Sequence, residues 1–237
     1  MKKALIFWGG WDGHEPQLVS RRFAAILEKN GIQTEVYDHQ ECLSDYEKLL
    51  TYDLIVPCWT GGKLLYSHNV AEAVARGVGL AGCHGGMCDA FREDTEWQFM
   101  TGGQWVSHPG GDIAYTVNIR RNANPITEGL EDFPVESEQY YLHVDPAIEV
   151  LATTRFPVAN YYHCANKPID MPVVWTKFWG IGRVFYNSLG HHDDVFDKSP
   201  AAQVMMERGM LWAAGGKEYA EKNGLTVDRY LNSAKMY

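Results

Sequence analysis

A histidine occupies the position in this chain where many α/β hydrolases carry their nucleophile. The apolar run at 78–82 predicts a buried strand, and Cys83-His84-Gly85-Gly86 directly after it predicts a glycine-rich elbow that leads into a helix. The partial positive charge at a helix N-terminus disfavours a protonated imidazole, so His84 should be neutral. A neutral imidazole can bind a metal or exchange protons near neutral pH. We therefore predict that His84 is catalytic.

The second reactive segment is Gly190-His191-His192-Asp193, which follows a strand predicted over 183–189. A histidine oriented by a nearby carboxylate is the usual arrangement for general base catalysis and for metal ligation. Adjacent side chains diverge, so we expect His191 to point inward and His192 outward. We predict that His191 works with His84 and that Asp193 is the catalytic carboxylate that orients His191. A solvated polar turn is the alternative interpretation.

Aromatic, acidic and imidazole groups also lie in loops that leave other predicted strands. Segment 9–15 is rich in glycine, segment 102–111 is interpreted as a long glycine-rich loop, and a strand over 138–144 would carry Glu138 and Tyr140 on one face. Flat aromatic rings beside acids and amides suit sugar or polyol ligands. We therefore predict that a small-molecule sugar substrate contacts Trp11, His14, Trp59, Trp105, His108, Glu138 and Tyr140.

Several of these histidines could share a metal ion. Zn²⁺ or another divalent metal suits a set of imidazoles with one carboxylate. No H-x-x-x-H pair anchors such a set, so acid–base catalysis without a metal remains an alternative. No nucleotide cofactor is expected, because the glycines at 9–13 lack the G-x-G-x-x-G spacing. The candidate metal ligands are His14, His84, His108 and His191.

The order of predicted elements indicates an α/β fold. Strands are predicted over 4–8, 33–37, 54–57 and 78–82, with helices from Pro16 to Asn30, from a Ser44 cap toward Leu50, and over 68–76. Strands over 113–120, 138–144, 149–153, 173–179 and 183–189 suggest an antiparallel extension. Ser199-Pro200 opens a helix through Trp212, and 217–237 is expected to form a helix plus a tail. We predict a mostly parallel sheet with helices on both faces, whose ligands bind at the carboxyl ends of the strands.

Length, charge and cysteine usage restrict the class of protein. With 237 residues, the chain is expected to form a single domain over 1–237. A formal net charge of -9 argues against nucleic acid or an anionic membrane as a partner. The five cysteines are odd in number and form no C-x-x-C pair, which favours reduced thiols in a cytoplasmic protein.

The motifs together resemble the trehalose-utilisation (ThuA-like) family over nearly the whole chain. The segments concerned are Gly9-Gly10-Trp11-Asp12-Gly13-His14-Glu15, residues 82–91, Gly102-Gly103-Gln104-Trp105 with His108-Pro109, Val174-Trp175-Thr176, residues 182–186 and Leu189-Gly190-His191. The resemblance implies a fold similar to class I glutamine amidotransferases, with a flavodoxin-like sheet. It also implies a role in disaccharide catabolism, alongside a sugar oxidoreductase that makes 3-keto sugars.

Three functions remain open from the sequence. The leading hypothesis is a sugar-catabolic enzyme that acts on a sugar or 3-keto-sugar derivative through histidines, with or without a metal. The amidotransferase pattern at the elbow is Gly-x-Cys-x-Gly, whereas this chain has His84 at the position of that cysteine. Glutamine amidotransferase chemistry is therefore not expected. The second hypothesis is a cysteine hydrolase that uses Cys83 or Cys88. The third is a non-catalytic sugar-binding or regulatory partner of an oxidoreductase. A homo-oligomer is compatible with each of these three functions.

Overall fold

The computed structural model describes residues 1–231, which are organised around one nine-stranded sheet. Its strand order is β2-β1-β3-β4-β11-β10-β9-β6-β7. A separate antiparallel pair, β5 (Gly103–Ser107) and β8 (Tyr141–Val144), lies beside it. The strands of the large sheet are β1 (Lys3–Gly10), β2 (Gln33–Tyr37), β3 (Leu54–Thr60), β4 (Gly79–Cys83), β6 (Asp112–Ile119), β7 (Phe133–Glu138), β9 (Glu149–Phe156), β10 (Ile169–Trp179) and β11 (Gly182–Asn187).

The sheet has a parallel half and an antiparallel half, as the sequence predicted. The neighbours from β2 through β11 pair in parallel, and those from β11 through β7 pair antiparallel. Every residue of β4 is buried, as expected for a parallel strand that helices cover on both faces. The α/β fold with an antiparallel extension is therefore confirmed.

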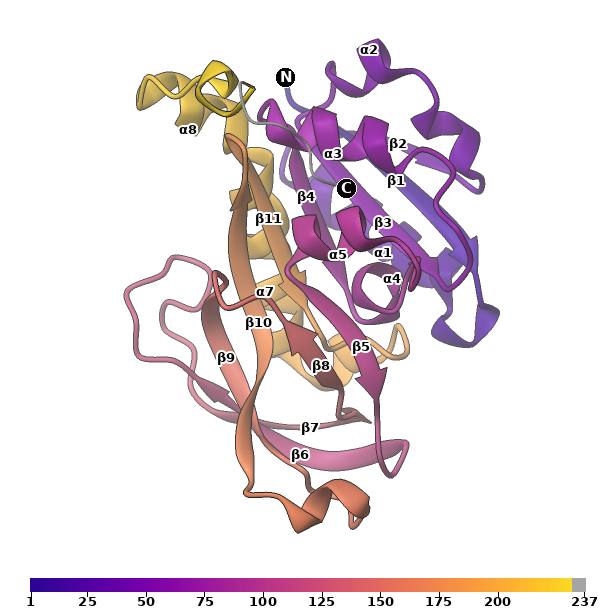
Figure 1. The fold of residues 1–237 in the computed structure, drawn as a ribbon, viewed down its shortest axis with the longest axis vertical. Helices are drawn as coiled ribbons and strands as arrows, with labels where there is room; N and C mark the ends of the chain where they lie inside the picture. The colour runs from indigo at the N-terminus through magenta and orange to yellow at the C-terminus, as the bar shows by residue number, and fades with distance from the viewer. Residues whose placement is uncertain (232–237) are drawn as a thin grey trace.

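Helices cover the two faces of the sheet with separate apolar cores (Figure 1). One core holds α1 (Pro16–Lys29) and α7 (Pro200–Ala214), and the other holds α3 (Ser67–Ala75), α4 (Gly85–Cys88) and α5 (Thr95–Thr101). Because the helices fill both faces, the ends of the strands are the natural place for a site. The remaining helices are η1 (Asp12–His14), η2 (Gln40–Leu43), α2 (Tyr46–Leu49), η3 (Tyr162–Ala165), α6 (Val195–Lys198), α8 (Gly216–Lys222) and η4 (Val227–Tyr230).

Three predicted elements differ in the structure. The cap of α2 is Asp45, whose carboxylate accepts the Lys48 N–H, rather than Ser44. The strand predicted over 138–144 is two strands, because Glu138 ends β7, which pairs with β6, and Tyr141 begins β8, which pairs with β5. The predicted loop at 102–111 contains β5, which gains its backbone partners from β8.

The C-terminal segment forms the expected helix. It is α8, followed by the short η4 turn. The predicted tail continues to Tyr237, and residues 232–237 lie outside the described residues.

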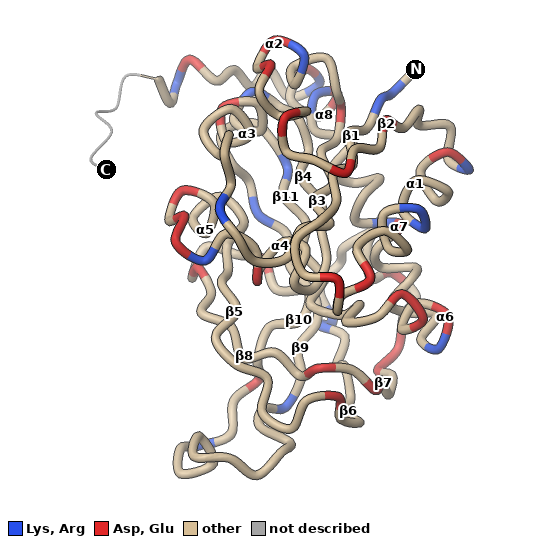
Figure 2. The backbone as a smooth tube through the Cα atoms, turned by 90° about the vertical axis from the view of Figure 1, so that its right-hand side faces the viewer, with Lys and Arg blue, Asp and Glu red and all other residues tan. Residues whose placement is uncertain are grey.

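No helix within residues 1–231 is both long and apolar enough to cross a bilayer. Figure 2 shows Lys and Arg scattered among Asp and Glu along the backbone rather than gathered into a basic strip. The formal net charge of the chain is -9.

Phe185 of β11 tests how much the α7 face contributes to stability. Its ring is fully buried, and a Cβ built on Gly209 of α7 would lie 2.3 Å from it. Phe185→Ala should lower the free energy of unfolding by about 3–5 kcal/mol, because it leaves a cavity between strand and helix. Phe178→Ala on the neighbouring strand, where the side chain is 47 % exposed, should cost under about 1 kcal/mol. Urea unfolding of both variants measures the difference, and equal losses would contradict this account of the core.

Candidate active site

Four buried side chains from distant segments meet at the carboxyl edge of the parallel strands. One ligand atom from each of His14, His84, Glu138 and His191 lies within 4.8 Å of the other three. His14 lies at the end of η1 after β1, and His84 follows β4. Glu138 ends β7, and His191 follows β11. We call these four residues the histidine–glutamate cluster.

The backbone at His84 forms the elbow that the sequence predicted. His84 has φ 47° and ψ −134°, a left-handed conformation that costs energy for a residue other than glycine. Its backbone N–H donates to the Asn187 carbonyl at 2.7 Å, and its carbonyl accepts from the Tyr186 hydroxyl at 3.0 Å. Its Nδ1 lies 2.8 Å from the Ser188 carbonyl, which can only accept, so Nδ1 carries a proton. Strand β11 and Ser188, the residue after it, therefore hold His84 with Nε2 facing Glu138, 3.1 Å away.

The Thr60 hydroxyl and the space beside Gly85 position the His14 ring. Its Nδ1 lies 2.8 Å from Thr60 Oγ1, at the end of β3. A Cβ on Gly85 would lie 2.3 Å from the His14 ring, so only glycine leaves space for this imidazole. The ring meets those of His84 and His191 edge to face, with centroids 4.7 and 5.1 Å away.

His191 completes the cluster on the side of the antiparallel strands. Its Nδ1 lies 3.3 Å from Glu138 Oε2 and 3.3 Å from His84 Nε2, while its Nε2 faces the Asp112 carboxylate at 3.7 Å. The His191 side chain is 9 % exposed and that of His192 is 41 % exposed. The structure therefore places His191 inward and His192 outward, as expected.

The charges of the cluster depend on one another. Burial, with the neighbouring His84 and His191, lowers the pKa of His14 to about 2. Burial also lowers the pKa of His84, although Glu138 acts in the opposite direction. Burial would raise the pKa of Glu138, but hydrogen bonds and charges from His191 and His84 hold it well below its usual range. Burial opposes protonation of His191 as well, yet Glu138 raises its pKa. The resting cluster therefore contains a carboxylate and favours a proton on His191.

The second nitrogen of each histidine faces an oxygen. These oxygens belong to Ser188, Thr60 and Asp112, for His84, His14 and His191 respectively. Metal-binding histidines in proteins almost always have such a partner, which fixes the tautomer and the ring orientation. The remaining three nitrogens and the Glu138 carboxylate converge, and this set of donors suits zinc and other divalent transition metals.

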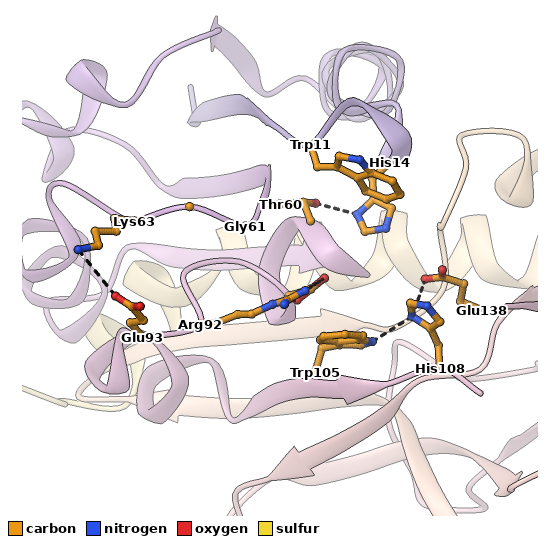
Figure 3. Close-up of a pocket in the computed structure, with 12 residues that line it drawn as sticks. Trp11, His14, Thr60, Gly61, Lys63, Arg92, Glu93, Trp105, His108 and Glu138 are labelled. Atoms are coloured by element: carbon orange, nitrogen blue, oxygen red, sulfur yellow. Dashed lines mark hydrogen bonds and ion pairs between the residues drawn. The ribbon is translucent and has the colours of Figure 1, made fainter. Parts of the chain in front are cut away.

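An open cavity of about 650 Å³ gives access to the cluster (Figure 3). His14 and Glu138 belong to both the cluster and the cavity wall. Trp11 and His14 approach from one side, and Trp105 and His108 from the other. The lining residues are Trp11, His14, Thr60, Gly61, Gly62, Lys63, Asp89, Arg92, Glu93, Trp105, His108 and Glu138.

The structure corrects the place of three predicted site residues. The Asp193 carboxylate accepts two hydrogen bonds from Arg22 at 2.7 Å, and the carboxylate that touches His191 is that of Glu138. His108 stays outside the cluster, because its Nδ1 accepts from Trp105 Nε1 and it reaches the cluster only through Glu138. Trp59 packs over Gly9 and toward Phe7 of the core.

Tyr140 lies under the cluster. Its ring stacks on His84 with centroids 4.1 Å apart, and its hydroxyl is buried without a hydrogen-bond partner among residues 1–231. Tyr140 therefore supports the imidazole from behind, whereas the sequence placed it against the substrate.

Several residues of the site escaped sequence reasoning. Thr60 and Asp112 each lie beside a histidine of the cluster, and Arg22 binds Asp193. Thr60 had a usable signal, since it follows the strand predicted over 54–57 and precedes Gly61. Arg22 had none, because it lies on a helix and meets Asp193 only through the tertiary fold.

The two candidate nucleophilic cysteines are buried in the cores. Burial raises the pKa of the Cys83 thiol and that of the Cys88 thiol well above their usual range. Nucleophilic catalysis needs a thiolate, so the raised pKa of both thiols argues against this role. The elbow therefore presents an imidazole to the site and directs the adjacent sulfur into the core.

Solved structures place this fold in the α/β class of the glutamine amidotransferases. A ThuA-like protein from Parabacteroides merdae is 21 % identical with a TM-score of 0.70, and 91 % of each chain is covered. A glutamine amidotransferase from Thermotoga maritima is 12 % identical with a TM-score of 0.51, covering 97 % of this chain and 88 % of that one. A β-galactosidase from Bacillus circulans is 15 % identical with a TM-score of 0.58, covering 95 % of this chain and 31 % of that one. At these identities the similarity shows the fold alone.

The chain belongs to the ThuA family. The model of that family, described as trehalose utilisation, matches residues 3–213. No match to a curated protein was found. The resemblance inferred from the sequence motifs is therefore confirmed.

Thiol labelling tests the cysteine hypothesis. A maleimide reagent should label the exposed Cys164 of the native protein and should label Cys83 and Cys88 only after unfolding, because both are buried. Mass spectrometry of labelled peptides measures the order. Rapid labelling of Cys83 or Cys88 in the folded protein, with loss of activity, would instead favour the cysteine hydrolase.

Proposed function

We propose that this protein is an enzyme of sugar catabolism whose reactive centre is the histidine–glutamate cluster with a bound divalent metal. The observation that carries the proposal is that each histidine of the cluster has its second nitrogen toward an oxygen, at 2.8 Å for His84 and His14 and at 3.7 Å for His191. This pairing directs three imidazole nitrogens and one carboxylate to a common point. A buried cluster built only for stability would not need four titratable side chains beside an open cavity.

The donor set indicates the chemistry. Three nitrogens and one carboxylate suit Zn²⁺ first among divalent ions. A metal bound there would polarise a substrate oxygen. The proton on His191 would leave when the metal binds, because ligands must be deprotonated.

His108 is the proposed proton-transfer group outside the metal ligands. It lines the cavity, and its side chain is 37 % exposed. His108 Nδ1 lies 3.2 Å from Trp105 Nε1 and 3.3 Å from Glu138 Oε2, so the indole and the carboxylate position the ring. An imidazole on the cavity wall can give a proton to a sugar oxygen and take one back.

The family supports a sugar as the substrate. Membership in the ThuA family relates the chain to trehalose utilisation. The cavity is of the size that small-molecule sites have, and it combines indole rings with acidic and basic groups. We propose a sugar or 3-keto-sugar derivative as the substrate, a cytoplasmic location, and a sugar oxidoreductase as the supplier of the keto group.

The metal content of ligand and second-nitrogen variants tests the proposal. The purified protein should hold about one divalent metal per chain, and His14→Ala and His191→Ala should lose it together with turnover of 3-keto-trehalose. Thr60→Val removes only the partner of His14 and should weaken metal binding by about 10- to 100-fold. Elemental analysis and a competition titration with a chelating dye measure both effects.

Two control variants distinguish the effect of losing a cluster residue from a general loss of protein stability. His68→Ala on α3 removes an imidazole that is 60 % exposed, and Thr116→Val changes an exposed threonine on β6. Both should keep metal and activity. Metal-free protein with full activity would remove the metal from the proposal, and unchanged turnover in His191→Ala would refute the cluster as the reactive centre.

A further inference from the structure

A second group of potential metal ligands lies beside the histidine–glutamate cluster and consists of Asp112, His191 and His192. One ligand atom from each of the three lies within 4.8 Å of the other two. We propose that this group, which we call the outer metal site, binds a second divalent ion and that His191 bridges the two ions. The inference rests on the proposed function only for the bridging, because the outer metal site can bind its ion whether or not the cluster holds one.

The distances around Asp112 match those between two ligands of one ion. Asp112 Oδ2 lies 3.7 Å from His191 Nε2 and 3.9 Å from His192 Nε2. Both distances are too long for hydrogen bonds. Two ligand atoms of a tetrahedral zinc ion lie about 3.3 Å apart, since each bond to the metal is about 2.0–2.1 Å long. Small side-chain rotations would therefore bring the three atoms around one ion.

Strands β6 and β7 place a carboxylate at each nitrogen of the His191 ring. Asp112 begins β6 and lies opposite Glu138 of β7 in the register. Glu138 Oε2 is 3.3 Å from Nδ1 of His191, and Asp112 faces Nε2. Within residues 1–231, the ion pairs of the Asp112 carboxylate are those with His191 and His192. The side chain is 44 % exposed, so it has the freedom to turn toward an ion.

His192 has a buried nitrogen that a bound metal would explain. Its Nδ1 is buried without a hydrogen-bond partner among residues 1–231. Glu15 Oε2 lies 3.9 Å from this nitrogen and accepts the Asp193 backbone N–H at 2.9 Å. With Nε2 of His192 on a metal, the proton of the ring lies on Nδ1 and faces Glu15. This is the carboxylate–histidine–metal arrangement that metal-binding histidines usually adopt.

The charges around the outer metal site favour a cation. Asp193 is paired with Arg22, and Asp194 is paired with Lys198. Glu15 and Asp112, by contrast, have no lysine or arginine partner within residues 1–231. Two carboxylates without a cationic partner, beside two imidazoles, attract a divalent ion and offset its charge.

His191 can serve both ions because its two nitrogens face different groups. With Nδ1 on an ion in the cluster, the proton of the neutral ring lies on Nε2, toward Asp112. An ion in the outer metal site would take the place of this proton, which would leave to solvent. The ring would then be an imidazolate shared by the two metals.

The outer ion would act on the reactive centre through His191 rather than by touching the substrate. The part of the cavity wall that residues 1–231 form does not include Asp112, His191 or His192. With three protein ligands, the ion would complete its coordination with water. Its binding should be weaker than that in the cluster, because Asp112 and His192 are partly exposed.

Equilibrium dialysis of the full chain against ZnCl2, followed by elemental analysis, tests the outer metal site. The wild type should bind about two Zn²⁺ ions per chain at saturation, because each set of ligands holds one ion. His192→Ala and Asp112→Asn should each lose the outer ion and keep the ion in the cluster. His14→Ala should keep the outer ion alone, and His191→Ala should lose both ions.

Matched variants serve as controls. His39→Ala removes an imidazole that lies 3.2 Å from Glu41, a histidine–carboxylate pair elsewhere on the surface. Asp170→Asn removes the charge of a carboxylate that is 62 % exposed and paired with Arg155. Both should bind as many zinc ions as the wild type. In the absence of zinc, His192→Ala should unfold at the temperature of the wild type, because its side chain is 41 % exposed.

The variants distinguish failure of the outer metal site from failure of the proposed function. An unchanged zinc content in His192→Ala would overturn the outer metal site, and one ion retained by His191→Ala would overturn the bridging. For a wild type that binds a single ion, retention of that ion in His14→Ala would refute the metal in the cluster and leave the outer metal site standing. A wild type without zinc would refute both sites.

Discussion

The candidate site depends on the hydrogen bonds that join His84 to β11 and to Ser188 directly after it. A buried imidazole costs free energy unless its polar atoms find partners, and the backbone at this elbow is in a left-handed conformation that is itself unfavourable. The carbonyls of Asn187 and Ser188 satisfy the backbone N–H and Nδ1 of His84, and the Tyr186 hydroxyl satisfies its carbonyl. With every other polar group satisfied, Nε2 remains for Glu138 and the cluster. Parallel pairing of β4 with β11 makes this possible, because it aligns the two strand ends.

Each half of the sheet contributes a different kind of group. The parallel strands β1, β4 and β11 end at one edge and deliver the three imidazoles there. The antiparallel half delivers the carboxylate, since β7 ends at Glu138. Within the cluster this carboxylate lowers the cost of a proton on His191 and would offset part of the charge of the proposed divalent ion.

The elbow after β4 decides which side chain reaches the cluster. It directs His84 to the cluster, and Cys83 one residue earlier lies in the core with residues of α7. Successive side chains at a strand end point to opposite sides, so a shift of one residue would exchange the imidazole for the thiol. The fold shared with glutamine amidotransferases thus says little about the reaction, and the side chains at the elbow decide it.

The sequence by itself determined the α/β order, the elbow at His84, the inward His191 and the family. These follow from local signals, namely apolar runs, glycines and motif spacing, which act within a few residues. Only the tertiary structure decided that Glu138 joins the cluster while His108 and Asp193 do not. The reason is that β7 ends with Glu138 at the cluster, that Arg22, far from Asp193 in the sequence, binds the Asp193 carboxylate, and that Trp105 binds His108. Partners contributed by remote segments leave no periodic pattern in the chain, because sequence spacing does not encode which strand ends come together.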